Sequence, residues 1–187
     1  MTKRLCLLGL VLVGCGDSQE LMPLQVGNTW RYSVSAGFKD DLTEVRVLRV
    51  ASVAGVEGVV LTGPMGESHL AWKGDTLIAE RFSNTTFKPA VPLLVNSDRR
   101  TRRTWSGKAM GIWGQFQGTG TLNQAPAEEQ IGGQRIKGIK TELTILNPKG
   151  KNIRLQTMFQ PGFGVVSQRQ WVGGDQLISL ERLGGSN

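Results

Sequence analysis

His69 is the only histidine in the chain, so it is the first residue to consider as an acid–base catalyst. One histidine cannot build a metal site with several His ligands, and no G-x-S-x-G, S-x-x-K or C-x-x-C motif supplies an activated nucleophile. Its neighbours, residues 68–72, are typical of a strand that presents the imidazole on an exposed face or edge. We expect no catalytic residue and no enzyme activity. A carboxylate pair drawn from distant strands, as in glycosidases, stays open.

Two acidic pairs, Asp40-Asp41 and Glu128-Glu129, are the candidates for metal binding. Calcium loops place their oxygen ligands at alternating positions around a glycine, and neither pair has that spacing. Both pairs lie among turn-forming residues, which favours solvated turns. The sequence therefore predicts no metal ion and no cofactor.

A dense group of arginines follows Asp98 and precedes Trp105. Guanidinium groups bind phosphate through paired hydrogen bonds, so these side chains could contact an anionic lipid surface. Two alternatives explain the same residues and stay open. The arginines could belong to a solvated hairpin loop, or their charges could prevent edge-to-edge pairing of neighbouring strands. The candidate contact residues are Arg99, Arg100, Arg102 and Arg103.

Cys15 ends a segment with the composition of an export signal. Lys3 and Arg4 precede a nine-residue apolar run, residues 5–13, which is too short to span a bilayer as a helix. The sequence Leu12-Val13-Gly14-Cys15 resembles the lipobox of bacterial lipoproteins. That resemblance implies cleavage before Cys15, lipid attached to its thiol, and anchoring in an envelope membrane.

These features divide the chain into a lipoprotein signal peptide (1–14), a lipidated Cys with a flexible tether (15–22) and a single domain (23–187). By resemblance to enterobacterial lipoproteins, Gly16 after the lipidated Cys favours the outer membrane, facing the periplasm. The net charge of +7 includes Lys3 and Arg4 of the predicted signal; without these two residues it is about +5, which is compatible with anionic lipid headgroups. Nucleic acid is excluded as a partner because the chain is exported.

Apolar and polar residues alternate with a period of two through most of the domain, as in half-buried antiparallel strands. The alternation is clearest in residues 30–34, 139–145 and 153–159, and it shifts phase at Leu48, which predicts a β-bulge. Turn-forming pairs recur every 8–12 residues or so. The best helix candidate, residues 125–129, is limited to about one turn by the glycines that follow. We predict an all-β fold: one curved antiparallel sheet or open barrel of about ten strands.

Three patches of the domain resemble uncharacterised bacterial lipoproteins and periplasmic proteins: the opening "PL-x-x-GN-x-W-x-Y" at residues 23–32, a loose match at 132–139, and the late "PG-x-G" turn at 159–166. These proteins resemble the lipoprotein-carrier (Lol-type) fold, so the resemblance implies a curved sheet with an apolar concave face.

The same patches have a physical interpretation. Trp30 and Tyr32 are expected to fill the core from one strand face, and Phe163 to plug the sheet between two turn glycines. We expect the concave face to bind an apolar or lipid-like ligand. The alternative is a structural or assembly lipoprotein that binds another envelope protein.

Overall fold

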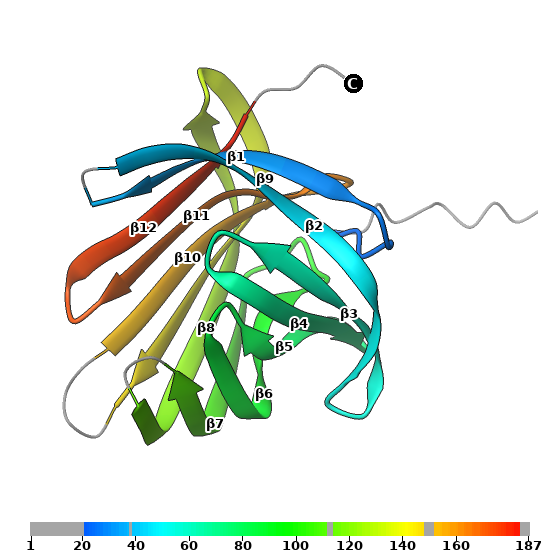
Figure 1. The fold of residues 1–187 in the computed structure, drawn as a ribbon, viewed down its shortest axis with the longest axis vertical. Coiled ribbons are helices and arrows are strands. Elements are labelled where there is room, and N and C mark those ends of the chain that lie inside the picture. The colour runs from blue at the N-terminus through cyan, green and yellow to red at the C-terminus, as the bar shows by residue number, and fades with distance from the viewer. Residues whose placement is uncertain (1–20, 38, 112–113, 148–151, 184–187) are drawn as a thin grey trace, which may run out of the picture.

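The computed structural model describes residues 21–37, 39–111, 114–147 and 152–183, which form a closed antiparallel β-barrel (Figure 1). Each strand pairs with its neighbours in sequence, and β1 pairs with β12 to close the barrel. The strands are β1 (Thr29–Ala36), β2 (Lys39–Val53), β3 (Val56–Gly63), β4 (Gly66–Lys73), β5 (Thr76–Phe82), β6 (Thr85–Val95), β7 (Thr101–Gly111), β8 (Gly114–Ile131), β9 (Gln134–Leu146), β10 (Asn152–Gln160), β11 (Gly164–Val172) and β12 (Asp175–Arg182).

The predicted all-β antiparallel class is confirmed, with twelve strands in place of about ten. The sheet also closes on itself, which the open-barrel prediction did not anticipate. Closure matters physically because every strand has a neighbour on both sides, although the β6–β7 ladder is short and the end of β8 extends beyond β7. No helix long and apolar enough to cross a membrane occurs in the part of the chain that the structure describes.

The core fills the interior of the barrel and explains why β1 forms where it does. Trp30, Tyr32 and Val34 alternate with exposed or half-exposed residues, and all three are buried. The inward residues of the other strands join them in one apolar cluster. Burying an aliphatic or aromatic side chain contributes about 1.5–3 kcal/mol. The apolar residues of the period-two pattern are therefore the ones that face the interior of the barrel.

The predicted bulge at Leu48 is confirmed. Val47 pairs with Leu61 and Arg49 pairs with Val60, so Leu48 is the extra residue between two consecutive pairs of the β2–β3 ladder. An extra residue reverses the side-chain alternation beyond it. Leu48 itself is exposed, whereas Val47 is buried in the core.

Residues 125–129, the helix candidate, belong instead to the 18-residue strand β8. They pair with β9 in an unbroken register from Ala125 opposite Lys140 to Ile131 opposite Gln134. Continuous pairing with β9 satisfies the backbone better than one isolated helical turn would. The β7 ladder ends at Gln124, so Pro126 lies on a free edge, where a missing N–H is tolerated.

The first described residues before β1 pack against the barrel. Leu21 and Met22, the part of the predicted tether that the structure describes, are both buried. The indole Nε1 of Trp72 donates a hydrogen bond to the Met22 carbonyl over 3.3 Å. A Cβ on Gly164 would lie 2.8 Å from the Met22 sulfur, so the absence of a side chain there makes room for Met22. The chain thus enters the barrel beside the β10–β11 turn.

Strands β6 and β7 pair over only three residues, and side chains connect them elsewhere. Trp105 Nε1 on β7 donates to the Pro89 carbonyl on β6 over 2.8 Å. Gln124 on β8 is buried, accepts a hydrogen bond from the Val95 amide and donates to the carbonyls of Val95 and Ser97, each at 2.8 Å. These bonds hold the free end of β6 where the backbone ladder is absent.

Candidate functional site

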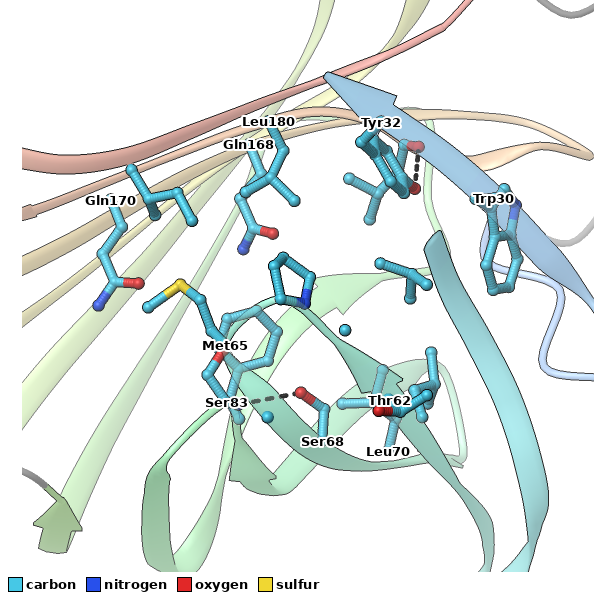
Figure 2. A pocket seen from close by; sticks show the side chains of 18 of the residues that line it. Trp30, Tyr32, Thr62, Met65, Ser68, Leu70, Ser83, Gln168, Gln170 and Leu180 are labelled. Carbon is cyan, nitrogen blue, oxygen red and sulfur yellow. Dashed lines mark hydrogen bonds between the residues drawn. The ribbon is translucent and has the colours of Figure 1, made fainter. Parts of the chain in front are cut away.

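A cavity of about 90 Å³ lies inside the barrel, between β1, β11 and β12 on one side and the β3–β4 and β5–β6 turns on the other (Figure 2). We call it the barrel cavity. Most of its wall is apolar, and none of its described lining residues carries a charge. Its main apolar contributors are Trp30, Tyr32, Leu61, Leu70, Val165 and Leu180.

Two hydrogen bonds fix the aromatic wall of the barrel cavity. Trp30 Nε1 donates to the Phe163 carbonyl over 2.7 Å, and the Tyr32 hydroxyl donates to the Val165 carbonyl over 2.8 Å. Burial raises the pKa of Tyr32 far above its usual value, and nearby Arg182 opposes this shift. At ordinary pH the phenol is therefore neutral, as a hydrogen-bond donor must be.

The expectation that Phe163 plugs the sheet is wrong. Its side chain is 37% exposed, and the Arg182 guanidinium lies 4.5 Å from the centre of its ring. The backbone of Phe163, through its carbonyl, is what supports Trp30. The flanking Gly162 and Gly164 have φ values of 77° and 81°, so the sharp turn predicted from the glycines is present.

The opposite wall consists of two hairpin turns that lie side by side. Ser83, in the β5–β6 turn, donates its backbone N–H to the Ser68 hydroxyl on β4 over 2.9 Å. Gly66, at the β3–β4 turn, has a φ of 94°, and a Cβ there would lie 2.6 Å from the Asn84 carboxamide oxygen. Met65 projects from the same turn into the barrel cavity (Figure 2).

Two carboxamides, those of Gln168 and Gln170, interrupt the apolar wall. Both belong to β11, and both extend from it toward the β3–β4 hairpin in Figure 2. Neither carboxamide makes a hydrogen bond to another described residue, so its donors and its acceptor are available to a ligand. These two polar groups could orient a bound molecule through hydrogen bonds.

A second, smaller cavity of about 30 Å³ continues the interior. Phe82 and Gln170 line both cavities, so they stand between them. The rest of its wall is apolar except for Thr85, and it includes Phe87, Leu143, Ile145 and Leu155. The two cavities are therefore neighbours in the interior, with Phe82 and Gln170 between them.

His69 lies on β4 as predicted, on the face opposite to Ser68 and Leu70, which line the barrel cavity. Its Nε2 atom is buried and lies 3.6 Å from a Glu67 carboxylate oxygen, which is longer than a hydrogen bond. Glu67 also lies 3.9 Å from Arg81 on β5. The imidazole is thus part of an outer ionic group, away from the interior.

The four arginines are all exposed, but they do not form one loop. Arg99 and Arg100 precede β7, whereas Arg102 and Arg103 belong to it. Consecutive strand residues point to opposite faces, and Arg103 Nη2 lies 3.2 Å from the Asp75 carboxylate, within hydrogen-bond distance. The four side chains therefore do not share a single face.

The acidic pairs also lie in strands, which corrects the prediction of solvated turns. Asp41, near the start of β2, accepts a hydrogen bond from the Leu42 amide, and the Lys39 ammonium beside it lowers the pKa of its carboxyl. Glu128 and Glu129 on β8 form ion pairs with basic residues of β9. No group of three metal-ligating side chains occurs within residues 21–183 as far as they are described.

Cys15 and the signal peptide lie outside the described residues, so their predicted roles stay predictions. The sequence interpretation missed Gln168 and Gln170 as site residues. A signal existed: they alternate with Ser167 and Arg169 on a strand, at positions where the other inward strands carry apolar residues. Without the register, the inward face of β11 could not be told from the outward one.

No protein-family model matches the sequence, and no curated protein sequence matches it. A candidate lipoprotein of Parabacteroides distasonis has a similar fold, with a TM-score of 0.49, 11% identity, and coverage of 89% of this chain and 98% of that one. A candidate exported protein of Bacteroides fragilis with a YmcC-like fold has a TM-score of 0.49, 9% identity, and coverage of 86% and 96%. The hypothetical lipoprotein YmcC of Escherichia coli has a TM-score of 0.45, 12% identity, and coverage of 91% and 89%. At these identities the likeness concerns the fold.

Proposed function

We propose that the protein is a lipid-anchored protein of the bacterial envelope that binds an apolar, lipid-like ligand inside its barrel and catalyses no reaction. The barrel cavity is the observation that carries this proposal. It combines a wall of apolar side chains with a few uncharged polar groups, as small-molecule binding sites do. Its volume of about 90 Å³ is roughly six times what one water molecule requires.

The position of Met22 links the barrel cavity to the proposed anchor. Met22 lines the cavity and follows Cys15 by seven residues. Even a fully extended chain of that length reaches only about 25 Å. Lipid on Cys15 would therefore hold the cavity close to the membrane surface, which is the natural source of an apolar ligand. We propose the outer membrane, facing the periplasm, on the basis of Gly16.

The polar groups of the barrel cavity suit binding better than catalysis. Ser68 already accepts a hydrogen bond from the Ser83 amide, and the described lining includes no histidine, carboxylate or lysine that could serve as a base. His69 lies on the outer face of β4. A nucleophile without a base is weakly reactive, so we assign the cavity to binding.

The alternative role in envelope assembly has less support from the described surface. Leu42 and Val50 of β2 are the most exposed large apolar residues on that strand, at 70% and 55%. The bulge at Leu48 lies between them, and Leu42 pairs with outward Ser33, whereas Val50 pairs with inward Val59. They therefore do not share one apolar face, and single exposed apolar residues are common.

The test uses the mature chain, residues 16–187, made without lipid so that no detergent is needed. All described residues are retained, because the first of them is Leu21. Native mass spectrometry should find co-purified lipid, and the neutral fluorophore N-phenyl-1-naphthylamine should bind. Leu180→Phe, which fills the cavity, should weaken fluorophore binding, whereas Leu42→Phe on the exposed surface should not. Equal binding by both variants would place the ligand elsewhere.

The anchor needs a separate test in cells. Cys15→Ala should leave an uncleaved or wrongly cleaved precursor and should remove the protein from the membrane fraction. A normally processed, membrane-bound Cys15→Ala protein would contradict lipid anchoring without affecting the proposal of ligand binding.

A further inference from the structure

We infer that the barrel cavity selects an uncharged amphiphile, meaning an acyl chain that carries a hydroxyl, ester or amide group in place of an ionised head. The inference rests on the proposed function, because it names the class of ligand for the same cavity. Its central observation is the pair of half-buried carboxamides, Gln168 and Gln170, which line a mostly apolar cavity and make no hydrogen bond to another described residue.

The strand register shows how unusual these two side chains are in their surroundings. Residues two apart on a strand share a face and lie about 6.6 Å apart, so both glutamines face the interior from β11. Gln170 is opposite Leu155 and Ile178, and Gln168 is opposite Thr157 and Leu180. Both carboxamides are half-buried, so a bound polar group could form hydrogen bonds with them that no described residue makes.

The hydrogen-bonding capacity of the pair determines which heads fit. Each carboxamide offers two donor hydrogens and one acceptor oxygen. A hydroxyl, an ester carbonyl or an amide can exchange hydrogen bonds with both. Two other polar groups of the lining already make hydrogen bonds within the protein, since Tyr32 donates to Val165 and Ser68 accepts from Ser83.

The charge of the wall excludes an ionised head. None of the described lining residues is an arginine, lysine or histidine that could pair with a carboxylate or phosphate. Burying an unpaired ion costs far more than burying a neutral polar group, so ionised lipids are disfavoured in this cavity. Arg182 is opposite Tyr32, but its guanidinium lies 4.5 Å from the centre of the Phe163 ring, and Arg182 is not among the residues that line the cavity.

The dimensions of the two cavities suit the slender chain of such an amphiphile. The barrel cavity of about 90 Å³ and the second cavity of about 30 Å³ share Phe82 and Gln170 as lining residues. We expect a single acyl chain to extend from the barrel cavity toward the second cavity while its polar group stays beside the glutamines. The second cavity offers mainly apolar side chains, which suits the end of such a chain.

The test measures displacement of N-phenyl-1-naphthylamine from the mature chain by three ligands of equal chain length: decanol, decanamide and decanoate, at about pH 8, where the acid is ionised. Decanol and decanamide should bind at least about tenfold more tightly than decanoate. The double variant Gln168→Leu, Gln170→Leu should bind decanol and decanamide about tenfold more weakly while it still binds the fluorophore. Gln117→Leu, at an exposed position of β8, is the matched control and should behave as the unmodified chain.

Each other outcome has a distinct meaning. Tight fluorophore binding with decanoate equal to or better than decanol would overturn this inference and leave the proposed function standing. A preference for neutral ligands that survives in the double variant would overturn the role of the two glutamines. Failure of the fluorophore and all three ligands to bind a folded chain would overturn the proposed function, and this inference with it.

Discussion

The hydroxyl of Tyr32 on β1 donates a hydrogen bond to the Val165 carbonyl on β11, 2.8 Å away and 133 residues along the chain. The two strands are not neighbours, because β12 lies between them in the barrel. The Trp30 indole makes a parallel bond to the Phe163 carbonyl. The opening and closing motifs of the domain are thus joined directly, and together they build one wall of the barrel cavity.

We predict that Tyr32 does not ionise in the folded protein at about pH 11, although an exposed tyrosine ionises near pH 10. Burial raises its pKa in the folded state, and the chain has no other tyrosine, so the tyrosinate absorbance band reports on Tyr32 alone. A raised pKa means that the folded state holds its proton more tightly than the unfolded state. The associated stability is therefore fully present below about pH 10 and is lost as pH rises above that value.

Two measurements check this prediction. Absorbance during an alkaline titration should rise only as the protein unfolds, as followed by circular dichroism. The free energy of unfolding should fall more steeply above about pH 10 in the unmodified chain than in Tyr32→Phe, which has no phenol to ionise. Tyrosinate absorbance that appears near pH 10 while the fold is intact would contradict the buried, hydrogen-bonded position.

Gln124→Met should lower the free energy of unfolding by about 1–3 kcal/mol. The substitution keeps a similar volume but leaves the amide and carbonyl of Val95 without their partner at the point where β6 has no β7 ladder. Gln117→Met, at an exposed site on the same strand, should change stability by less than about 0.5 kcal/mol. Urea denaturation of both variants gives the comparison, and equal midpoints would show that Gln124 does not hold β6.

The fold class could be predicted from the sequence because a strand with one buried face has an apolar residue at every second position. Trp30 and Tyr32 were placed correctly on that basis, and the phase shift at Leu48 located a real bulge. Closure of the barrel was not predictable, since the pairing of β1 with β12 depends on contacts between residues such as Val34 and Leu180, which lie far apart in sequence. Periodicity describes each strand but not its partners.

The site was harder to predict than the fold. Gln168 and Gln170 look like ordinary outward residues until the ladder with β10 shows that they face the same side as Leu155. Glu128 and Glu129 appeared to be turn residues because Pro126 and two glycines surround them, yet pairing with β9 overrode those local preferences. The residue types of a short segment do not show which side chains from different strands face the same cavity.

His69→Ala should leave ligand binding by the barrel cavity unchanged and should alter stability by less than about 0.5 kcal/mol. The imidazole lies on the outer face of β4, and its Nε2 atom makes no hydrogen bond within the described structure. Leu70→Ala, at the next position but facing the interior, should cost about 2–5 kcal/mol and reduce fluorophore binding. Loss of native function in a folded His69→Ala protein, as severe as deletion of the gene, would restore an enzyme as the leading hypothesis.

Replacement of Arg99, Arg100, Arg102 and Arg103 by Gln should barely change stability. The four side chains are exposed, and an exposed ion pair such as Arg103 with Asp75 contributes at most about 1 kcal/mol. Chemical denaturation of the variant and the unmodified chain measures this directly. A larger loss would mean that the arginines hold the loop between β6 and β7 in place.

The same variant tests contact with an anionic surface. Because Arg102 and Arg103 point to opposite faces of β7, we expect the unlipidated mature chain and the Gln variant to bind phosphatidylglycerol vesicles equally at about 0.15 M salt, where the Debye length is about 8 Å. The control removes as much charge elsewhere, by Gln substitution of Arg46, Arg49, Lys73 and Lys108. At low salt, both variants should lose the same share of binding, since only net charge then matters. Binding that is lost from the arginine variant alone, and that weakens steeply with salt, would establish the cluster as a specific membrane contact.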